Sequence, residues 1–140
     1  FIGGGYDLPK TRKLIATVKN ADKPEIVGIA QRFAKLGFEI YSTGGTCDYL
    51  NSHGVPTHRL HKIEEGTPNI LDMILSGEVD LVVNTPTNIR KENRDGFLIR
   101  RNAVETGTPC ITSLDTATAL LMSLEQADKE DLSVIDIAQI

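Results

Sequence analysis

The sequence has no tryptophan, only two cysteines and no long apolar run, and each shortage narrows what the chain can be. Cys47 and Cys110 stand alone, without the close pairing of a zinc or redox site, so we expect two buried thiols. No apolar run approaches the ~18 residues of a membrane span. With no signal-peptide pattern either, a reducing, cytoplasmic setting fits best. His53, His58 and His61 lack the spacing of a metal site or a catalytic triad, and we expect solvated side chains.

A strong excess of one charge sign is also missing. Lys and Arg number 15 against 19 Asp and Glu, which gives a formal net charge of -4. DNA, RNA or an anionic membrane would require a basic face, so general affinity for them is excluded, although a local pocket for one phosphate is compatible with this balance. The 140 residues, 40% of them hydrophobic, support one globular domain with one core.

The first residues are typical of a connector. The stretch from Phe1 to Pro9 lacks an initiator Met and carries Gly and Pro without an amphipathic period. We therefore expect residues 1–12 to be a linker from a preceding domain and residues 13–140 to form the folded domain.

Strand and helix patterns alternate about five times along the rest of the chain. Short apolar, β-branched runs predict strands at 13–18, 38–41, 55–60, 79–83 and 109–112. Pro56 marks the third of these as an edge strand, because proline cannot donate to a central ladder. The alternation predicts an α/β fold, with a mainly parallel five-stranded sheet covered on both faces in a three-layer α/β/α sandwich.

Helical spacing of apolar residues predicts the intervening helices, which are 23–36, 46–53, 67–77, 97–106 and one from 115 onward. The third is expected to begin with Thr67 as N-cap and Pro68 at the first helical position, and the last to be capped by Asp115. We predict a polar loop at 88–96, and either a strand or a docked tail at 132–140.

A glycine-rich turn follows the second predicted strand. In an open parallel sheet, ligands bind outside the carboxyl ends of the strands, and the stretch 42–46 (Ser-Thr-Gly-Gly-Thr) lies there. Gly44 and Gly45 let the backbone approach a ligand, while free N–H groups at the helix start attract an anion. Thr43 and Thr46 add hydroxyl donors. Taken alone, a Gly-Gly turn is weak evidence, since it is also compatible with a purely structural turn.

The other strand ends carry further polar groups. In chain order, these candidates are Thr17, Lys23, Lys62, Asn84, Thr85 and Thr87. Two lysines with several hydroxyl and amide donors suit a dianionic phosphate attached to a polar body. A single lysine is usually a solvated surface residue, so the predicted phosphate site depends on these groups converging.

The order of these motifs resembles the C-terminal allosteric domain of carbamoyl phosphate synthetase large subunits, which has the methylglyoxal-synthase-like fold. The stretches that carry the resemblance are Lys23, Ser-Thr-Gly-Gly-Thr46, Lys62-Ile-Glu-Glu-Gly66, Val-Val-Asn84-Thr85 and Leu-Ile-Arg100-Arg101-Asn-Ala. It covers the chain from about residue 10 onward. The preceding Gly-Tyr-Asp-Leu-Pro is similar to the linker that joins this domain to the synthetase body.

The resemblance implies a regulatory domain with no catalytic residue of its own, within a cytoplasmic, ATP-dependent, glutamine-hydrolysing ligase of arginine and pyrimidine biosynthesis. It implies an effector such as UMP or IMP, with ornithine or N-acetylglutamate in some members. By position, Lys23, Thr43, Thr46 and Lys62 match the phosphate and ribose contacts, and Asn84 and Thr17 match neighbouring strand-end contacts. Pro86 departs from the Ser or Thr of some bacterial members, which leaves open whether Thr85 or Thr87 takes over.

The resemblance also implies partners. These are a small anionic effector, the remaining domains of the large subunit, the glutaminase small subunit and a homo-oligomer, with neither nucleic acid nor membrane among them. No metal or cofactor is expected in this domain, whereas the full-length enzyme would use ATP with Mg²⁺ or Mn²⁺. Arg100 and Arg101 are candidates for an interface or for a helix-end ion pair. The effector's identity and sign of action stay open, as does the oligomeric state.

Three other functions share the fold or the turn. Methylglyoxal synthase, a lyase acting on dihydroxyacetone phosphate, needs a carboxylate base. Its Asp is missing from the matching stretch, Glu65-Gly-Thr-Pro68, where Glu64 or Glu65 would have to substitute. Inosine monophosphate cyclohydrolase would require a Lys-Thr-Leu-His-Pro stretch that is absent. A stand-alone phosphate-binding module disagrees with the connector-like first residues.

Overall fold

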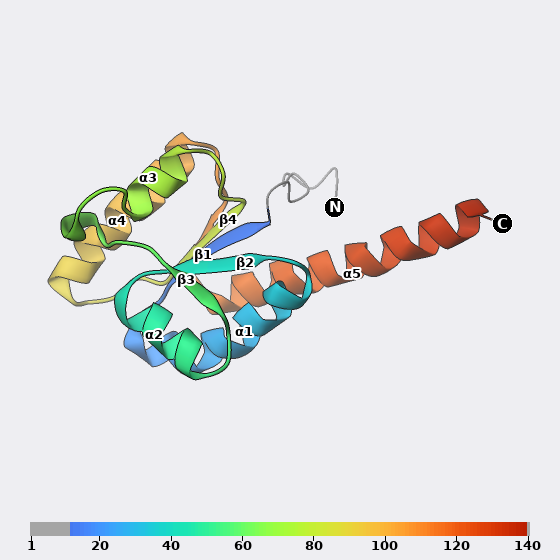
Figure 1. Cartoon of the computed structure of the whole chain (residues 1–140), viewed down its shortest axis with the longest axis horizontal. Coiled ribbons are helices and arrows are strands. Elements are labelled where there is room, and N and C mark those ends of the chain that lie inside the picture. Colours follow the sequence, from blue (N-terminus) through green and yellow to red (C-terminus); the bar gives the residue numbers. More distant parts are fainter. Residues whose placement is uncertain (1–11, 140) are drawn as a thin grey trace.

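Five parallel strands form the central sheet, in the order β3-β2-β1-β4-β5 (Figure 1). Their bounds are β1 (Lys13–Thr17), β2 (Glu39–Ser42), β3 (Thr57–Arg59), β4 (Leu81–Asn84) and β5 (Cys110–Ile111). This computed structural model describes residues 12–139, and their side chains to residue 128. The predicted linker therefore lies outside the described residues except for Arg12. The parallel five-stranded sheet and its edge strand near Pro56 are confirmed.

Helices cover both faces of the sheet and make the predicted three layers. On one face lie α1 (Lys23–Lys35), α2 (Gly44–Ser52) and α5 (Leu114–Gln139); on the other lie α3 (Ile70–Leu75) and α4 (Arg90–Glu105) (Figure 1). Alternate residues of β1 supply the two cores, because successive side chains of a strand point to opposite faces. Leu14 and Ala16 pack with α1 and α5, whereas Ile15 packs with α3 and α4.

The strand order changes direction at β1. The chain runs outward from β1 to β2 and β3, and then returns to place β4 on the other side of β1. A crevice for ligands opens at such a switch point, outside the carboxyl ends of the strands. The loops after β1 and β4 are therefore the ones that the topology brings together.

Helices α4 and α2 begin earlier than predicted. The prediction of a polar loop at 88–96 is wrong, because α4 begins at Arg90. This stretch is dominated by charged and polar residues, so it shows no apolar period until Gly96, Ile99 and Ala103, which are the buried positions of the helix. The start of α2 is also earlier than predicted, since Gly44 and Gly45 lie inside its first turn.

The predicted cap of α3 is wrong as well. Instead of Thr67 and Pro68, Asn69 is the N-cap, and its Oδ1 accepts the N–H groups of Leu71 (2.9 Å) and Asp72 (3.3 Å). Asp72 completes a capping box by accepting the N–H of Asn69 at 2.7 Å. Proline at the first position of a helix is a general preference, and here the reciprocal Asn69–Asp72 bonds set the start instead.

Two expectations for the last helix also differ. Ser113, and not Asp115, provides the oxygen that accepts the N–H of Thr116, at 3.1 Å. Residues 132–139 continue α5 instead of forming a strand or a docked tail.

The cysteines and histidines agree largely with expectation. Cys47 is buried, whereas Cys110 is only half-buried, so the prediction of two core thiols is wrong for Cys110. Burial raises the thiol pKa of both. The three histidines are exposed, as predicted. No helix of residues 12–139 is long and apolar enough to cross a membrane.

Candidate functional site

A cavity of about 150 Å³ lies at the carboxyl edge of the sheet, where the loops after β1 and β4 meet. The predicted site residues that line it are Thr17, Lys23, Thr43, Gly45, Thr46, Lys62, Asn84, Thr85 and Thr87. Gly44 lies next to the cavity without lining it. The structure therefore brings the predicted residues to one place, from four loops that are far apart in the sequence.

Two lysine ammonium groups crowd against the start of α2. A Cβ atom at position 44 would lie 2.9 Å from Lys62 Nζ, and one at position 45 would lie 2.7 Å from Lys23 Nζ. Gly44 also has a φ of +47°, which favours glycine. Neither ammonium group forms an ion pair with a carboxylate among the side chains that the structure describes. Their charge adds to that of the α2 N-terminus, so this end of the cavity suits an anion.

The two most buried threonines that line the cavity, Thr46 and Thr85, form hydrogen bonds with the backbone of the loop after β1. The N–H of Val18 donates to Thr46 Oγ1 at 3.4 Å, and this hydroxyl lies 3.3 Å from Val18 O, to which it can donate in turn. On the other side, Thr85 Oγ1 accepts the N–H of Lys19 at 2.8 Å. Both hydroxyls thus fix the loop after β1, a structural role that the sequence did not indicate.

The residues on either side of Thr85 lie differently. Pro86 is exposed and does not line the cavity, whereas Thr87 does. Thr87 Oγ1 accepts the N–H of Ile89 at 3.3 Å and keeps its own proton to donate. Thr85 likewise accepts one N–H and keeps its proton, so the two hydroxyls differ chiefly in burial, Thr85 being the more buried.

Asn84 connects two elements at the end of β4. Its side chain is buried, with Nδ2 2.7 Å from Thr17 Oγ1 and Oδ1 2.7 Å from Arg100 Nη1. Arg100 thus bonds to Asn84 and, among the described residues, does not form the helix-end ion pair that was one of its two expected contacts. Arg101 does form the helix-end ion pair, with Glu105 at 3.3 Å.

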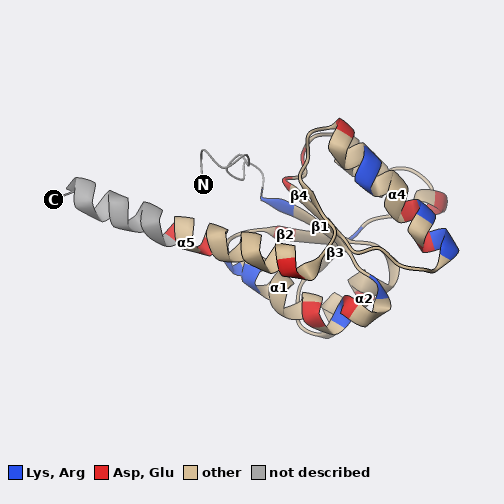
Figure 2. Cartoon of the chain, turned by 180° about the vertical axis from the view of Figure 1, so that it is seen from behind, with Lys and Arg blue, Asp and Glu red and all other residues tan. Residues whose placement is uncertain are grey.

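Helix α4 supplies a wall that the sequence analysis missed. The residues of this helix that line the cavity are Lys91, Glu92, Asp95, Gly96 and Ile99. Their spacing of three or four places them on one face of a helix, and that periodicity is the signal that could have found them. Charged residues of both signs occur along α4 (Figure 2).

An ion pair ties α4 to the segment after β3. Lys91 Nζ lies 2.7 Å from Glu64 Oε1 in the short 3₁₀ helix Ile63–Glu65. The hydrogen bond lowers the pKa of Glu64 and raises that of Lys91. Burial, reinforced by the charge of Glu64, raises the pKa of Asp95. The cavity is therefore basic beside α2 and carries carboxylates beside α4.

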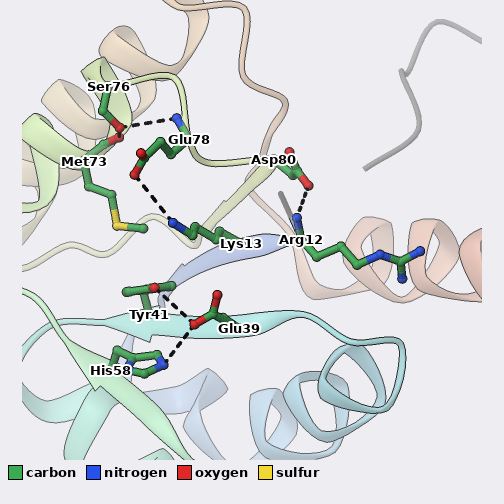
Figure 3. Close-up of polar contacts among 9 residues, drawn as sticks. All are labelled: Arg12, Lys13, Glu39, Tyr41, His58, Met73, Ser76, Glu78 and Asp80. Atoms are coloured by element: carbon green, nitrogen blue, oxygen red, sulfur yellow. Dashed lines mark hydrogen bonds and ion pairs between the residues drawn. The ribbon is translucent and has the colours of Figure 1, made fainter. Parts of the chain in front are cut away.

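A second polar cluster lies at the opposite, amino edge of the sheet (Figure 3). The ring of Tyr41 stacks on that of His58 with centroids 4.7 Å apart, and Glu39 contacts both side chains at 3.4 Å. Burial and the charge of Glu39 raise the pKa of Tyr41. In the described part of the chain, no group of three or more His, Cys, Asp or Glu side chains could hold a metal ion.

Comparison with known proteins identifies relatives of this chain. The model of the MGS-like domain matches residues 25–112. The chain is 52% identical over its whole length to the carbamoyl phosphate synthase large chain of Agathobacter rectalis, of which it spans 13%. It is 38% identical, over 95% of its residues, to the "carbamoyl phosphate synthase large chain, C-terminal section" of Methanopyrus kandleri, of which it spans 24%.

A solved structure supports the architecture. Methylglyoxal synthase from Elizabethkingia anophelis superposes with a TM-score of 0.66 at 21% identity, over 81% of this chain and 79% of that one. At this identity, the likeness concerns the fold alone.

Proposed function

This chain belongs to the MGS-like domain family, and on that premise we propose that it is the effector-binding regulatory domain of a carbamoyl phosphate synthase large chain. The observation that carries the proposal is the pair of ammonium groups, Lys23 and Lys62, which lie against the α2 N-terminus and form no ion pair among the described side chains. A phosphate monoester such as UMP or IMP would satisfy both groups and the helix N-terminus together.

The wider proposal concerns the whole enzyme. It is a glutamine-hydrolysing ligase of arginine and pyrimidine biosynthesis that uses ATP with Mg²⁺ or Mn²⁺. The proposed partners of this domain there are the remaining large-chain domains, the glutaminase small subunit and further copies in a homo-oligomer. The proposed location is the cytoplasm, in keeping with the free Cys47 and Cys110. Effector binding would regulate synthesis by favouring one conformation of the whole enzyme, with a coupling of about 1–3 kcal/mol.

Ligand-induced stabilisation of the 140-residue chain tests the proposal. We expect UMP or IMP to raise its melting temperature, because a ligand at 100 times its Kd stabilises the native state by about 2.7 kcal/mol. Lys23→Met and Lys62→Met should each abolish most of this shift. Lys35→Met is the matched control, since Lys35 is exposed in the last turn of α1. Equal shifts in all three variants would refute a phosphate site at the two lysines.

A lyase remains the second candidate because of one carboxylate. Glu65 is occupied, since its Oε1 accepts the N–H of Lys62 at 2.7 Å, and the lowered pKa of Glu64 makes it a weak base. Asp95 lines the cavity with a raised pKa, and is therefore the candidate base. We expect no methylglyoxal from dihydroxyacetone phosphate. Turnover that Asp95→Asn abolishes would replace the regulatory proposal with a lyase.

A further inference from the structure

We propose that Arg100 is a positioning residue that fixes the direction of a hydrogen-bond relay ending at the Thr17 hydroxyl in the cavity. The inference rests on the proposed function for the identity of the ligand. It adds which kind of ligand atom is favoured next to Thr17 in the cavity. Arg100 contacts Asn84 and does not itself line the cavity, so it acts through its neighbours.

The chemistry of the guanidinium sets the direction. An arginine side chain donates hydrogen bonds and cannot accept them, so the Asn84 atom 2.7 Å from Arg100 Nη1 is the amide oxygen. The Asn84 NH₂ group must then face the other way, and Nδ2 lies 2.7 Å from Thr17 Oγ1. Thr17 therefore accepts from Asn84, and its own proton is left to be donated.

The relay makes this part of the cavity wall a donor. Thr17 lines the cavity, and none of the hydrogen bonds among the described residues uses its O–H as donor. A ligand oxygen that accepts, such as that of a phosphate, carboxylate or carbonyl group, is favoured at this point. A ligand that presents no acceptor at this point would leave the Thr17 proton without a partner, which disfavours it.

Gly96 provides independent support for the relay. This residue lies within α4, where glycine costs helix stability relative to alanine. A Cβ atom there would lie 2.9 Å from Arg100 Nη1 and 3.0 Å from Asn84 Oδ1. The missing side chain is thus what allows the Arg100–Asn84 bond to form against the helix. Gly96→Ala should retain the fold and lose this bond.

Binding measurements on the 140-residue chain test the relay, with UMP and inorganic phosphate as probes. Thr17→Val removes the donor and should raise the Kd for UMP about tenfold, the usual effect of losing a hydrogen bond to a charged group. Arg100→Met and Gly96→Ala should each raise it about fivefold, and Arg100→Lys should restore much of the affinity. The matched control is Arg101→Met, because the Arg101 side chain of the wild type pairs with Glu105 outside the cavity.

A double variant distinguishes a relay from a general structural role. In the Thr17→Val background, Arg100→Met should have no further effect on the Kd, because both changes remove the same donated proton. Multiplied effects, or an unchanged Kd in Arg100→Met, would overturn the proposal.

A measurement without ligand keeps the two proposals separable. The Asn84 side-chain amide signals in a ¹⁵N spectrum, identified by their loss in Asn84→Asp, should move in Arg100→Met and Thr17→Val but not in Arg101→Met. Unmoved signals in Arg100→Met would overturn the relay. If the wild-type chain binds neither probe while the signals move as expected, the proposed function fails and the relay stands.

Discussion

Lys91 and Glu64 join the first turn of α4 to the segment after β3, with Nζ and Oε1 2.7 Å apart. The pair lies at the rim of the cavity, and both residues line it. Lys91, which is next to Glu92 of the cavity wall, is thereby paired with a carboxylate. The lysines that line the cavity without an ion pair among the described residues are Lys19, Lys23 and Lys62.

The first prediction concerns this pair. Glu64→Gln should leave the free energy of unfolding almost unchanged, because both side chains of the pair are largely solvated. It should tighten phosphate binding, because the Lys91 ammonium group loses its ion-pair partner and the cavity wall loses one negative charge. Denaturant unfolding and phosphate titration at low salt measure the two effects. Glu105→Gln, which breaks the Arg101 pair outside the cavity, is the control, and weaker phosphate binding in Glu64→Gln would contradict the prediction.

The second prediction is a pH dependence from Asp95. A carboxyl group whose pKa is raised in the folded state binds its proton more tightly there than in the unfolded chain. Its contribution to stability is therefore lost as the pH rises from the ordinary aspartate pKa through the raised one. Asp95→Asn should be more stable than the wild type at pH 7, with a gain that disappears below the ordinary pKa. Melting curves from pH 3 to 7 check this, and a gain that is constant with pH would contradict it.

The third prediction concerns the start of α3. Asn69→Ala should destabilise the fold by about 1 kcal/mol, because two N–H groups at the start of the helix lose their acceptor. Thr67→Ala should have little effect, although sequence preference favours Thr67 as the cap. Denaturant unfolding of the two variants distinguishes these expectations. An equal decrease in the free energy of unfolding in both variants would contradict Asn69 as the sole N-cap.

The sequence predicted the sheet well because its strands are short apolar runs between charges and turn residues. Three of the five strands, β2, β1 and β4, lie inside the sheet, and burial on both faces leaves a continuous apolar pattern such as that of Val82 and Val83 in β4. Because the predicted strands are parallel, their carboxyl ends share one edge, which places the loops of Lys23, Lys62 and Asn84 there.

The α4 wall could not be predicted by the same reasoning. Its first two turns face solvent and the cavity, so they bury too little apolar surface to show a period. Tertiary contacts such as the Lys91–Glu64 pair are absent from any local pattern. The direction of the Asn84 amide likewise depends on Arg100, 16 residues away and on another element.

Helix α4 has a consequence for how a bound effector could be sensed at a distance. Its 16 residues span about 24 Å, with Asp95 and Ile99 on the inner side and Phe97 and Val104 exposed on the outer side. A tilt of only about 5° at one end would displace the other by roughly 2 Å over that length. If the helix moves as a rigid rod, a small displacement beside the cavity therefore becomes a larger one at the end that carries the exposed Val104.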